Sequence, residues 1–104
     1  MYFVTAYAAL AEPHRRQILD LLRERERSVN DLVARLDISQ PGVSKHLRVL
    51  RESGLVAVRR DGRRRWYGLQ AQPLAEVDMW LEPYRDYWAG RFDALERHLE
   101  ENPE

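Results

Sequence analysis

The chain has 104 residues, a formal net charge of zero and no cysteine. A chain of this length forms one domain, here residues 1–104, and on its own it buries only about two-thirds of its unfolded surface. The lack of cysteine excludes a disulfide framework, a thiolate metal site and a thiol redox switch. No segment approaches the ~20 apolar residues of a membrane span, and no basic leader precedes an apolar run. We therefore expect a soluble, cytoplasmic protein without a membrane partner.

The zero net charge conceals two oppositely charged parts of the sequence. Residues 1–70 carry 14 Lys or Arg against 8 Asp or Glu, whereas residues 71–104 carry 3 against 9. Such segregation indicates that nucleic acid contacts one side of the molecule only. The alternative is that exposed helices simply carry charge, but that does not explain why the two signs are separated.

The first two helices are short and surround a proline. Phe3, Tyr7 and Leu10 are spaced for one face of a first helix, which is too short to be stable alone and must pack on something. Pro13 fits the first turn of a second helix, where its missing N–H costs nothing. Arginines of this second helix, such as Arg15, are expected to face water.

Two further helices over residues 28–53 have the signature of a helix-turn-helix. Ser28 caps the first of them and Ser39 the second, and Pro41 lies in the first turn of the latter. Gly54 follows as the expected C-terminal stop.

The second of these helices has two distinct faces. Val43, Leu47 and Leu50 cluster on the inward face of a helical wheel. The opposite arc and its flanks hold Gln40, Pro41, Ser44, Lys45, Arg48 and Arg51. A helix that presents Ser, Lys and Arg near its N-terminus suits the major groove of DNA.

A basic hairpin is predicted over residues 55–69. Asp61-Gly62, flanked by two strand-like segments, is the strongest short hairpin signal. The arginines near its tip are Arg59, Arg60, Arg63, Arg64 and Arg65. Their like charges repel, and the phosphates of a neighbouring minor groove or DNA backbone would relieve that repulsion.

The last segment, residues 74–100, is predicted to be one long helix. Its apolar residues recur at steps of three and four, at Leu74, Val77, Leu81, Tyr84, Trp88, Phe92, Leu95 and Leu99. Pro83 removes one backbone hydrogen bond and predicts a kink.

This stripe is larger than the rest of the domain can cover, so a partner helix is its natural cover. We expect a homodimer formed by residues 1–11 and 74–100. The expected interface residues are Phe3, Tyr7, Leu81, Tyr84, Trp88, Phe92 and Leu95. A second reading of the same aromatic residues is a cavity for a small-molecule effector between subunits, lined by Trp80, Tyr84, Tyr87 and Trp88.

Three segments, together with the arginine-rich hairpin, resemble the ArsR/SmtB-type winged-helix repressors. They are LAEPHRRQIL at residues 10–19, ISQPGVSKHLRVL at residues 38–50 and GLV at residues 54–56. The resemblance implies a mainly α fold with a small β-hairpin, in the order α-α-α-α-β-β-α. It also implies a homodimeric bacterial regulator of double-stranded operator DNA, whose first and last helices form the dimer interface.

In this family the fourth helix reads the major groove and the hairpin, or wing, contacts the minor groove or backbone. The resemblance places Gln40, Ser44, Lys45 and His46 at positions that contact DNA. With the residues inferred from the pattern, the expected DNA-binding set is Ser39, Gln40, Pro41, Ser44, Lys45, His46, Arg48, Arg51, Arg59, Arg60, Arg63, Arg64 and Arg65.

The metal-binding motifs of the family are missing. Metal-sensing members carry Cys-x-Cys-Asp-Leu at the start of the third helix, where this chain has Ser28 and Asn30, and neither is a soft ligand. Others use Asp-x-His in the last helix, where Asp78 is followed by Trp80 in place of the histidine. We therefore expect a metal-independent branch of the family, with no metal and no cofactor.

The three histidines lie far apart in the sequence. His14 is expected to have a structural or surface role and His98 to be solvated. For His46, two roles are open: phosphate contact, or local packing.

The pattern and the resemblance together predict a dimeric transcriptional repressor. Two alternatives remain open: a constitutive repressor without an effector, and a winged-helix module that binds protein. An enzyme is not expected, because the sequence offers no Ser-His-Asp set in a suitable context, no glycine-rich phosphate loop and no carboxylate pair in a predicted cleft.

Overall fold

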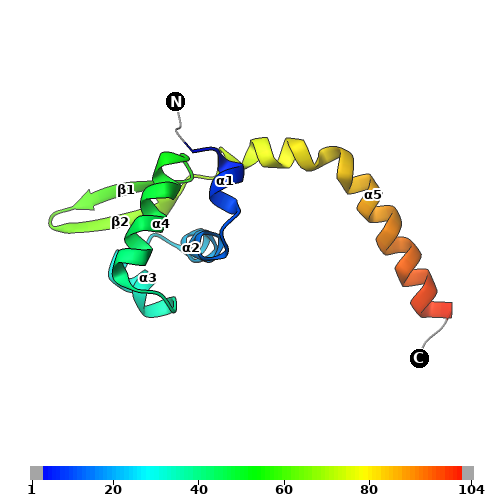
Figure 1. The fold of residues 1–104 in the computed structure, drawn as a ribbon, viewed down its shortest axis with the longest axis horizontal. Coiled ribbons are helices and arrows are strands. Elements are labelled where there is room, and N and C mark those ends of the chain that lie inside the picture. Colours follow the sequence, from blue (N-terminus) through cyan, green and yellow to red (C-terminus); the bar gives the residue numbers. More distant parts are fainter. Residues whose placement is uncertain (1–3, 102–104) are drawn as a thin grey trace.

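The computed structural model describes residues 4–101, without the side chains of residues 92–94, 100 and 101. Two expected interface residues, Phe3 and Phe92, therefore lie outside the described side chains. The elements in chain order are α1 (Ala6–Leu10), α2 (Pro13–Glu24), α3 (Val29–Arg35), α4 (Gln40–Glu52), β1 (Val56–Asp61), β2 (Arg64–Leu69) and α5 (Leu74–Glu101). The predicted α-α-α-α-β-β-α order is confirmed (Figure 1).

The molecule consists of a small body and one projecting helix (Figure 1). Helices α1 to α4 and the antiparallel β1–β2 hairpin form the body, and α5 leaves it on the side opposite to the hairpin. The extents of 60 × 34 × 20 Å reflect this projection. The axis of α5 changes direction along the stretch that contains Pro83, as the missing N–H and the ring of an internal proline require (Figure 1).

The core of the body joins α2, α3, α4 and the hairpin. Its fully buried large side chains are Ile18, Leu32, Val43, Leu47, Leu50 and Leu55. Val43, Leu47 and Leu50, the stripe predicted to face inward, are at most 2% exposed. Burial of each such side chain contributes about 1.5–3 kcal/mol, so this stripe fixes the orientation of α4 in the body.

The predicted helix boundaries are confirmed by their caps. Ser28 Oγ accepts the amide of Asp31 at 3.1 Å, and Ser39 Oγ accepts the amide of Gly42 at 3.2 Å. Each bond satisfies one of the amides that a helix start leaves without a partner. Gly54 follows α4 with φ 80°, a left-handed conformation that glycine adopts without strain.

The hairpin turns one residue later than predicted. Asp61 pairs with Arg64, so the loop residues are Gly62 and Arg63 rather than Asp61 and Gly62. Gly62 has φ 62°, and no described residue other than glycine has a positive φ. A two-residue turn with only its first residue at positive φ is of the II′ kind, whereas an Asp-Gly turn of type I′ would need positive φ at Asp61 as well.

The prediction that Arg15 faces water is wrong. Its Nε donates to the carbonyl of Ala9 at 2.7 Å and its Nη2 to that of Ala8 at 3.2 Å, while Arg16 donates to the carbonyl of Leu10 at 2.6 Å. Helix α1 is only five residues long, and a helix end leaves its last carbonyls short of intrahelical donors, although the Ala8 carbonyl also accepts the amide of Ala11 at 3.3 Å. The start of α2 therefore caps the end of α1.

Helix α1 also buries a different face from the predicted one. Ala6 and Ala9 enter the core, whereas Tyr7 stays 38% exposed. The Tyr7 hydroxyl donates to the backbone carbonyl of Glu76 at 3.1 Å, so this ring joins α1 to the first turn of α5.

Arg27, which the sequence did not single out, is a buried arginine, only 3% exposed, that links α2, α3 and β2. Its guanidinium donates to the carbonyl of Leu21 at 2.9 Å and to the carboxylates of Asp31 and Glu24 at 2.8 Å each. Its backbone exchanges two hydrogen bonds with Tyr67 in β2. The hydrogen bond from Arg27 is the main cause that holds the pKa of Asp31 below its ordinary value.

Replacement of Arg27 by Met should lower the free energy of unfolding by about 2 kcal/mol, because the carbonyl of Leu21 loses this donor and the carboxylate of Asp31 keeps only Arg35 of its two arginine partners. Urea unfolding followed by circular dichroism measures this loss. The control is Arg25→Met, at an exposed arginine of the same connection, which should change stability by less than about 0.5 kcal/mol. Equal stability of the two variants would contradict a structural role for Arg27.

Candidate nucleic-acid interface

Packing of the α4 stripe on α2, α3 and β1 leaves the opposite arc of α4 uncovered. Pro41, Ser44, Lys45 and Arg48 are exposed there and line a shallow hollow of about 480 Å³. The predicted outward arc is thus one continuous surface with two positive charges. A helix about 10–12 Å across that carries such a surface has the dimensions to enter a major groove about 12 Å wide.

A second hollow, of about 620 Å³, lies beside the hairpin. Gln40 at the start of α4 lines it together with Arg63, Arg64 and Arg65 of the hairpin. None of the described residues that line it is acidic. The fold thus brings two sets of predicted residues, which are separate in the sequence, to one concave and strongly basic site.

The arginines of the hairpin differ in their partners. Arg60 lies opposite Arg65 in the strand register, which places two like charges side by side, and Asp61 lies opposite Arg64. Arg59 instead holds the carboxylate of Glu26, with Nη2 at 2.9 Å from Oε1. Their hydrogen bonds lower the pKa of Glu26 and raise that of Arg59. Arg59 therefore anchors β1 to the connection between α2 and α3.

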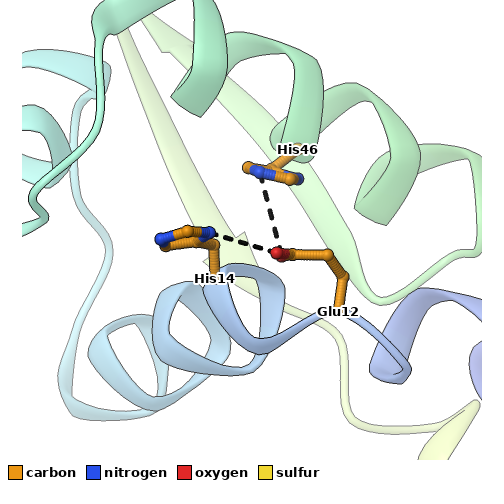
Figure 2. Close-up of side chains that lie close together, drawn as sticks. All are labelled: Glu12, His14 and His46. Atoms are coloured by element: carbon orange, nitrogen blue, oxygen red, sulfur yellow. Dashed lines mark hydrogen bonds and ion pairs between the residues drawn. The ribbon is translucent and has the colours of Figure 1, made fainter.

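The remaining predicted residues of α4 have different surroundings. Ser39 is exposed, but its hydroxyl is engaged as the cap of α4. Arg51 is exposed in the last turn. His46 points away from the outward arc and toward the first turn of α2, as Figure 2 shows. Of the two roles open for His46, this placement favours local packing.

The neighbours of His46 are Glu12 and His14, which sequence reasoning did not connect with it. His46 Nε2 lies 3.8 Å from Glu12 Oε2, and His14 Nδ1 lies 3.1 Å from Glu12 Oε1. The signal in the sequence was weak: Glu12 is the residue that caps α2 through a bond from the Arg15 amide, and His14 follows two residues later. Nothing local links either residue to His46, 32 positions further along the chain.

The charge separation expected from the sequence is also a separation in space. The basic hairpin and the acidic α5 lie at opposite ends of the molecule (Figure 1). On α5, Arg85 pairs with Asp78 and, at 2.7 Å, with Glu82. None of the helices that the structure describes has the length and apolar character needed to cross a membrane.

An aromatic ladder, defined as Tyr7, Trp80, Tyr84 and Trp88, runs from α1 along α5. Successive ring centroids are 6.2, 5.2 and 6.3 Å apart. The four side chains are nevertheless between 38% and 57% exposed. Tyr87, which was expected in the same pocket, lies apart from the ladder, with the guanidinium of Arg91 4.7 Å from its ring centroid.

The positions at which relatives bind metal have other contacts here. Ser28 and Asn30 line the basic hollow beside the hairpin. Asp78 is paired with Arg85, and Trp80 lies between Tyr7, which it meets edge to face, and Tyr84, to which it is tilted.

Comparison with known proteins identifies relatives of this architecture. The family model described as "Bacterial regulatory protein, arsR family" matches residues 12–58. An HTH-type transcriptional regulator of Mycobacterium tuberculosis is 42% identical over 72 residues, which cover 68% of this chain and 63% of that protein. The transcriptional repressor SdpR of Bacillus subtilis is 31% identical over 75 residues, covering 72% of this chain and 83% of SdpR.

The solved structures give the same result. An ArsR-like transcriptional regulator from Rhodococcus sp. RHA1 superposes with a TM-score of 0.71 at 30% identity, covering 91% of this chain and 87% of that one. The matched relatives are transcriptional regulators and not enzymes. On the matched motifs, the fold and this degree of identity, the chain belongs to the ArsR family of bacterial regulatory proteins.

Proposed function

We propose that the chain is a homodimeric DNA-binding transcriptional repressor. The observation that carries this proposal is the basic surface formed by the outward arc of α4 and by the hollow that Gln40 shares with the hairpin arginines. The arginines of these surfaces outnumber Asp61, the acidic residue opposite Arg64, and such an excess of like charge is unfavourable by itself and favourable against phosphate. The name of SdpR, a repressor, supports the direction of regulation.

The contacts divide between recognition and affinity. Gln40, Ser44 and Lys45 point from the first two turns of α4 and are assigned to base edges in the major groove. Phosphate contacts fix position without reading sequence. We assign them to Arg48 and Arg51 on α4 and to Arg60, Arg63, Arg64 and Arg65 of the hairpin. Arg59 is left out because Glu26 holds it, and His46 because it faces α2.

The dimer is argued from α5. Beyond its first turns this helix projects from the body, and Leu95 and Leu99 are exposed to 54% and 56% in addition to the aromatic ladder. Apolar surface of this extent on one face marks an interaction site, and the same face of a second copy covers it isologously. We assign Tyr7, Leu81, Tyr84, Trp88 and Leu95 to this interface. Such a dimer would present two α4 helices to two half-sites of one operator.

Three of the four residues expected in an effector pocket, Trp80, Tyr84 and Trp88, belong to the ladder. Their mutual contacts suit the core of an interface, because flat rings bury a large area at low entropic cost. We therefore assign them to dimerisation, with any small-molecule effector acting at the edge of that interface.

The α4 assignment predicts the effect of one double variant. Binding sites are first selected with the wild-type protein from duplex DNA of random sequence, and affinities are then measured for the selected site. The double variant Lys45→Ala with Arg48→Ala should weaken binding by about 100-fold. Each replaced residue costs roughly 1–2 kcal/mol of binding free energy in each subunit, and these losses are only partly additive. Arg23→Ala with Arg97→Ala removes the same charge elsewhere and should change affinity by only a few-fold.

Two outcomes would contradict the DNA-binding proposal. Failure to enrich any sequence, with no binding to random duplex even at low salt, would favour the protein-interaction module. Equal affinity of the double variant and the wild type would show that another surface reads DNA.

The wing assignment predicts a change in salt dependence. The six arginines assigned to phosphate in each subunit give up to about twelve contacts per dimer and a log–log slope of up to about −11 for affinity against salt concentration. Replacement of Arg63, Arg64 and Arg65 by Ala removes up to six contacts per dimer and should reduce the magnitude of that slope by about 5. Arg59→Ala should leave the slope nearly unchanged, and an equal reduction in both variants would refute the distinction between them.

The dimer proposal predicts that a charged residue introduced into the aromatic ladder separates the two subunits. Trp88→Glu would place an unpaired carboxylate in the interface, so the variant should sediment as a monomer where the wild type is a dimer. Met79→Glu is the matched control, because Met79 is 75% exposed and lies outside the ladder. Unchanged helical content by circular dichroism would show that the body still folds, and a dimeric Trp88→Glu protein would rule out this interface.

A further inference from the structure

Three side chains with metal-binding atoms meet where the first turn of α2 faces the middle of α4 (Figure 2). Glu12, His14 and His46 each offer one ligand atom, and these atoms lie within 4.8 Å of one another. All three residues are half-buried, and the two imidazole rings are stacked with centroids 5.7 Å apart. The carboxylate lies between them, 3.1 Å from the nearer nitrogen of His14 and 3.8 Å from that of His46.

The cluster stands on rigid elements rather than on mobile loops. Glu12 is fixed as the cap of α2, where one carboxylate oxygen accepts the amide of Arg15 at 3.0 Å. His14 follows in the first turn of the same helix. His46 precedes Leu47, a residue of the buried stripe, so the packing of α4 determines where its ring lies.

Two members of the cluster have shifted pKa values. Desolvation raises the pKa of Glu12, but bonds from the Arg15 amide and from His14 outweigh it and lower the pKa below its ordinary value. Burial lowers the pKa of His46, although the nearby Glu12 carboxylate opposes this shift. Metal ligands must be deprotonated, so an ion at this cluster would compete with protons for the carboxylate and the imidazoles.

We propose that Glu12, His14 and His46 bind one divalent transition-metal ion such as Zn²⁺ or Co²⁺. Two imidazole nitrogens and one carboxylate oxygen form a three-ligand protein set that leaves a fourth position for water. In a tetrahedral site with bonds of about 2.0–2.2 Å, ligand atoms lie about 3.3 Å apart. The present separations of up to 4.8 Å therefore need only a modest rotation of the side chains.

Arg15 weakens the expected affinity of this site for a cation. Its Nη1 lies 3.5 Å from His46 Nδ1, so its positive charge opposes a cation that Glu12 attracts. If the ion binds Nε2 of His46, the proton of the neutral ring moves to Nδ1, and Arg15 must give up this contact. It keeps its bonds to the carbonyls of Ala8 and Ala9, which hold α1 in place. The site is therefore expected to bind more weakly than a structural zinc site of four ligands.

This site is separate from the positions at which the third and fifth helices of relatives bind metal. An ion here would link α2 directly to α4, the helix assigned to DNA. Metal binding itself does not rest on that assignment, and it is tested without DNA.

The test is a Co²⁺ titration of the untagged full-length protein, stripped with a chelator and followed by visible absorption. With three histidines and no cysteine in the chain, ligand-field bands of a low-coordinate site have few other sources. We expect one ion per chain and, with Zn²⁺, a rise in the melting temperature, because the ion binds the folded state. His14→Asn and Glu12→Gln should each weaken Co²⁺ binding by at least about tenfold.

The variants are chosen so that folding is preserved. Glu12→Gln keeps an oxygen that can accept the Arg15 amide, and the side chain of His14 is 40% exposed. His98→Asn removes a histidine outside the cluster and should bind Co²⁺ like the wild type. The proposal is overturned if Co²⁺ gives no ligand-field absorption, if both cluster variants retain wild-type affinity, or if His98→Asn alone abolishes binding.

Discussion

The packing of one apolar stripe, Val43, Leu47 and Leu50, determines where the outward arc of α4 and the cluster that contains His46 lie. Because these side chains are fully buried against α2, α3 and β1, α4 cannot rotate about its axis. Its opposite arc then faces outward with Lys45 and Arg48, and its flank brings His46 to Glu12. The surface proposed to contact DNA and the cluster of Glu12, His14 and His46 are both consequences of one packed interface.

Arginine has two different tasks in this chain. Some arginines link parts of the fold through hydrogen bonds: Arg15 donates to the carbonyls at the end of α1, Arg27 to Leu21 and Asp31, and Arg59 to Glu26. The guanidinium suits this role because it presents several N–H groups in one plane and stays charged. At the hairpin tip Arg60, Arg63, Arg64 and Arg65 outnumber Asp61, and the remaining excess of positive charge makes this tip suited to phosphate.

Helix α5 shows the opposite balance, with more apolar surface than the body can use. The bend along the stretch that contains Pro83 carries the second half of the helix away from the body, so the aromatic ladder is covered on one side only. A small body with a long, half-covered helix is the arrangement expected if a second copy covers the apolar face of that helix and so completes the hydrophobic core. In this reading the acidic charge on α5 keeps it away from DNA, while the basic body faces it.

The sequence by itself determined the local structure, because that structure depends on spacings of a few residues. Helical periodicity located α4 and α5, and Ser28, Ser39 and Gly54 marked helix ends. Asp61-Gly62 between two strand-like segments marked the hairpin. The outward arc of α4 followed from the same periodicity. The turn was misplaced by one residue because the choice between turn types depends on backbone angles that Asp-Gly does not fix.

Only the tertiary structure decided which side chains meet across long separations. The helical pattern places Arg15 opposite the apolar stripe of α2 and so predicts that it faces water, whereas the folded chain turns back and brings the carbonyls of Ala8 and Ala9 to its guanidinium. The sequence groups Arg59 with the other wing arginines, but in the structure its guanidinium donates to the carboxylate of Glu26, 33 residues earlier. His46 joined Glu12 and His14 for the same physical reason: a contact between distant residues depends on how packed helices are oriented, and no local pattern encodes that.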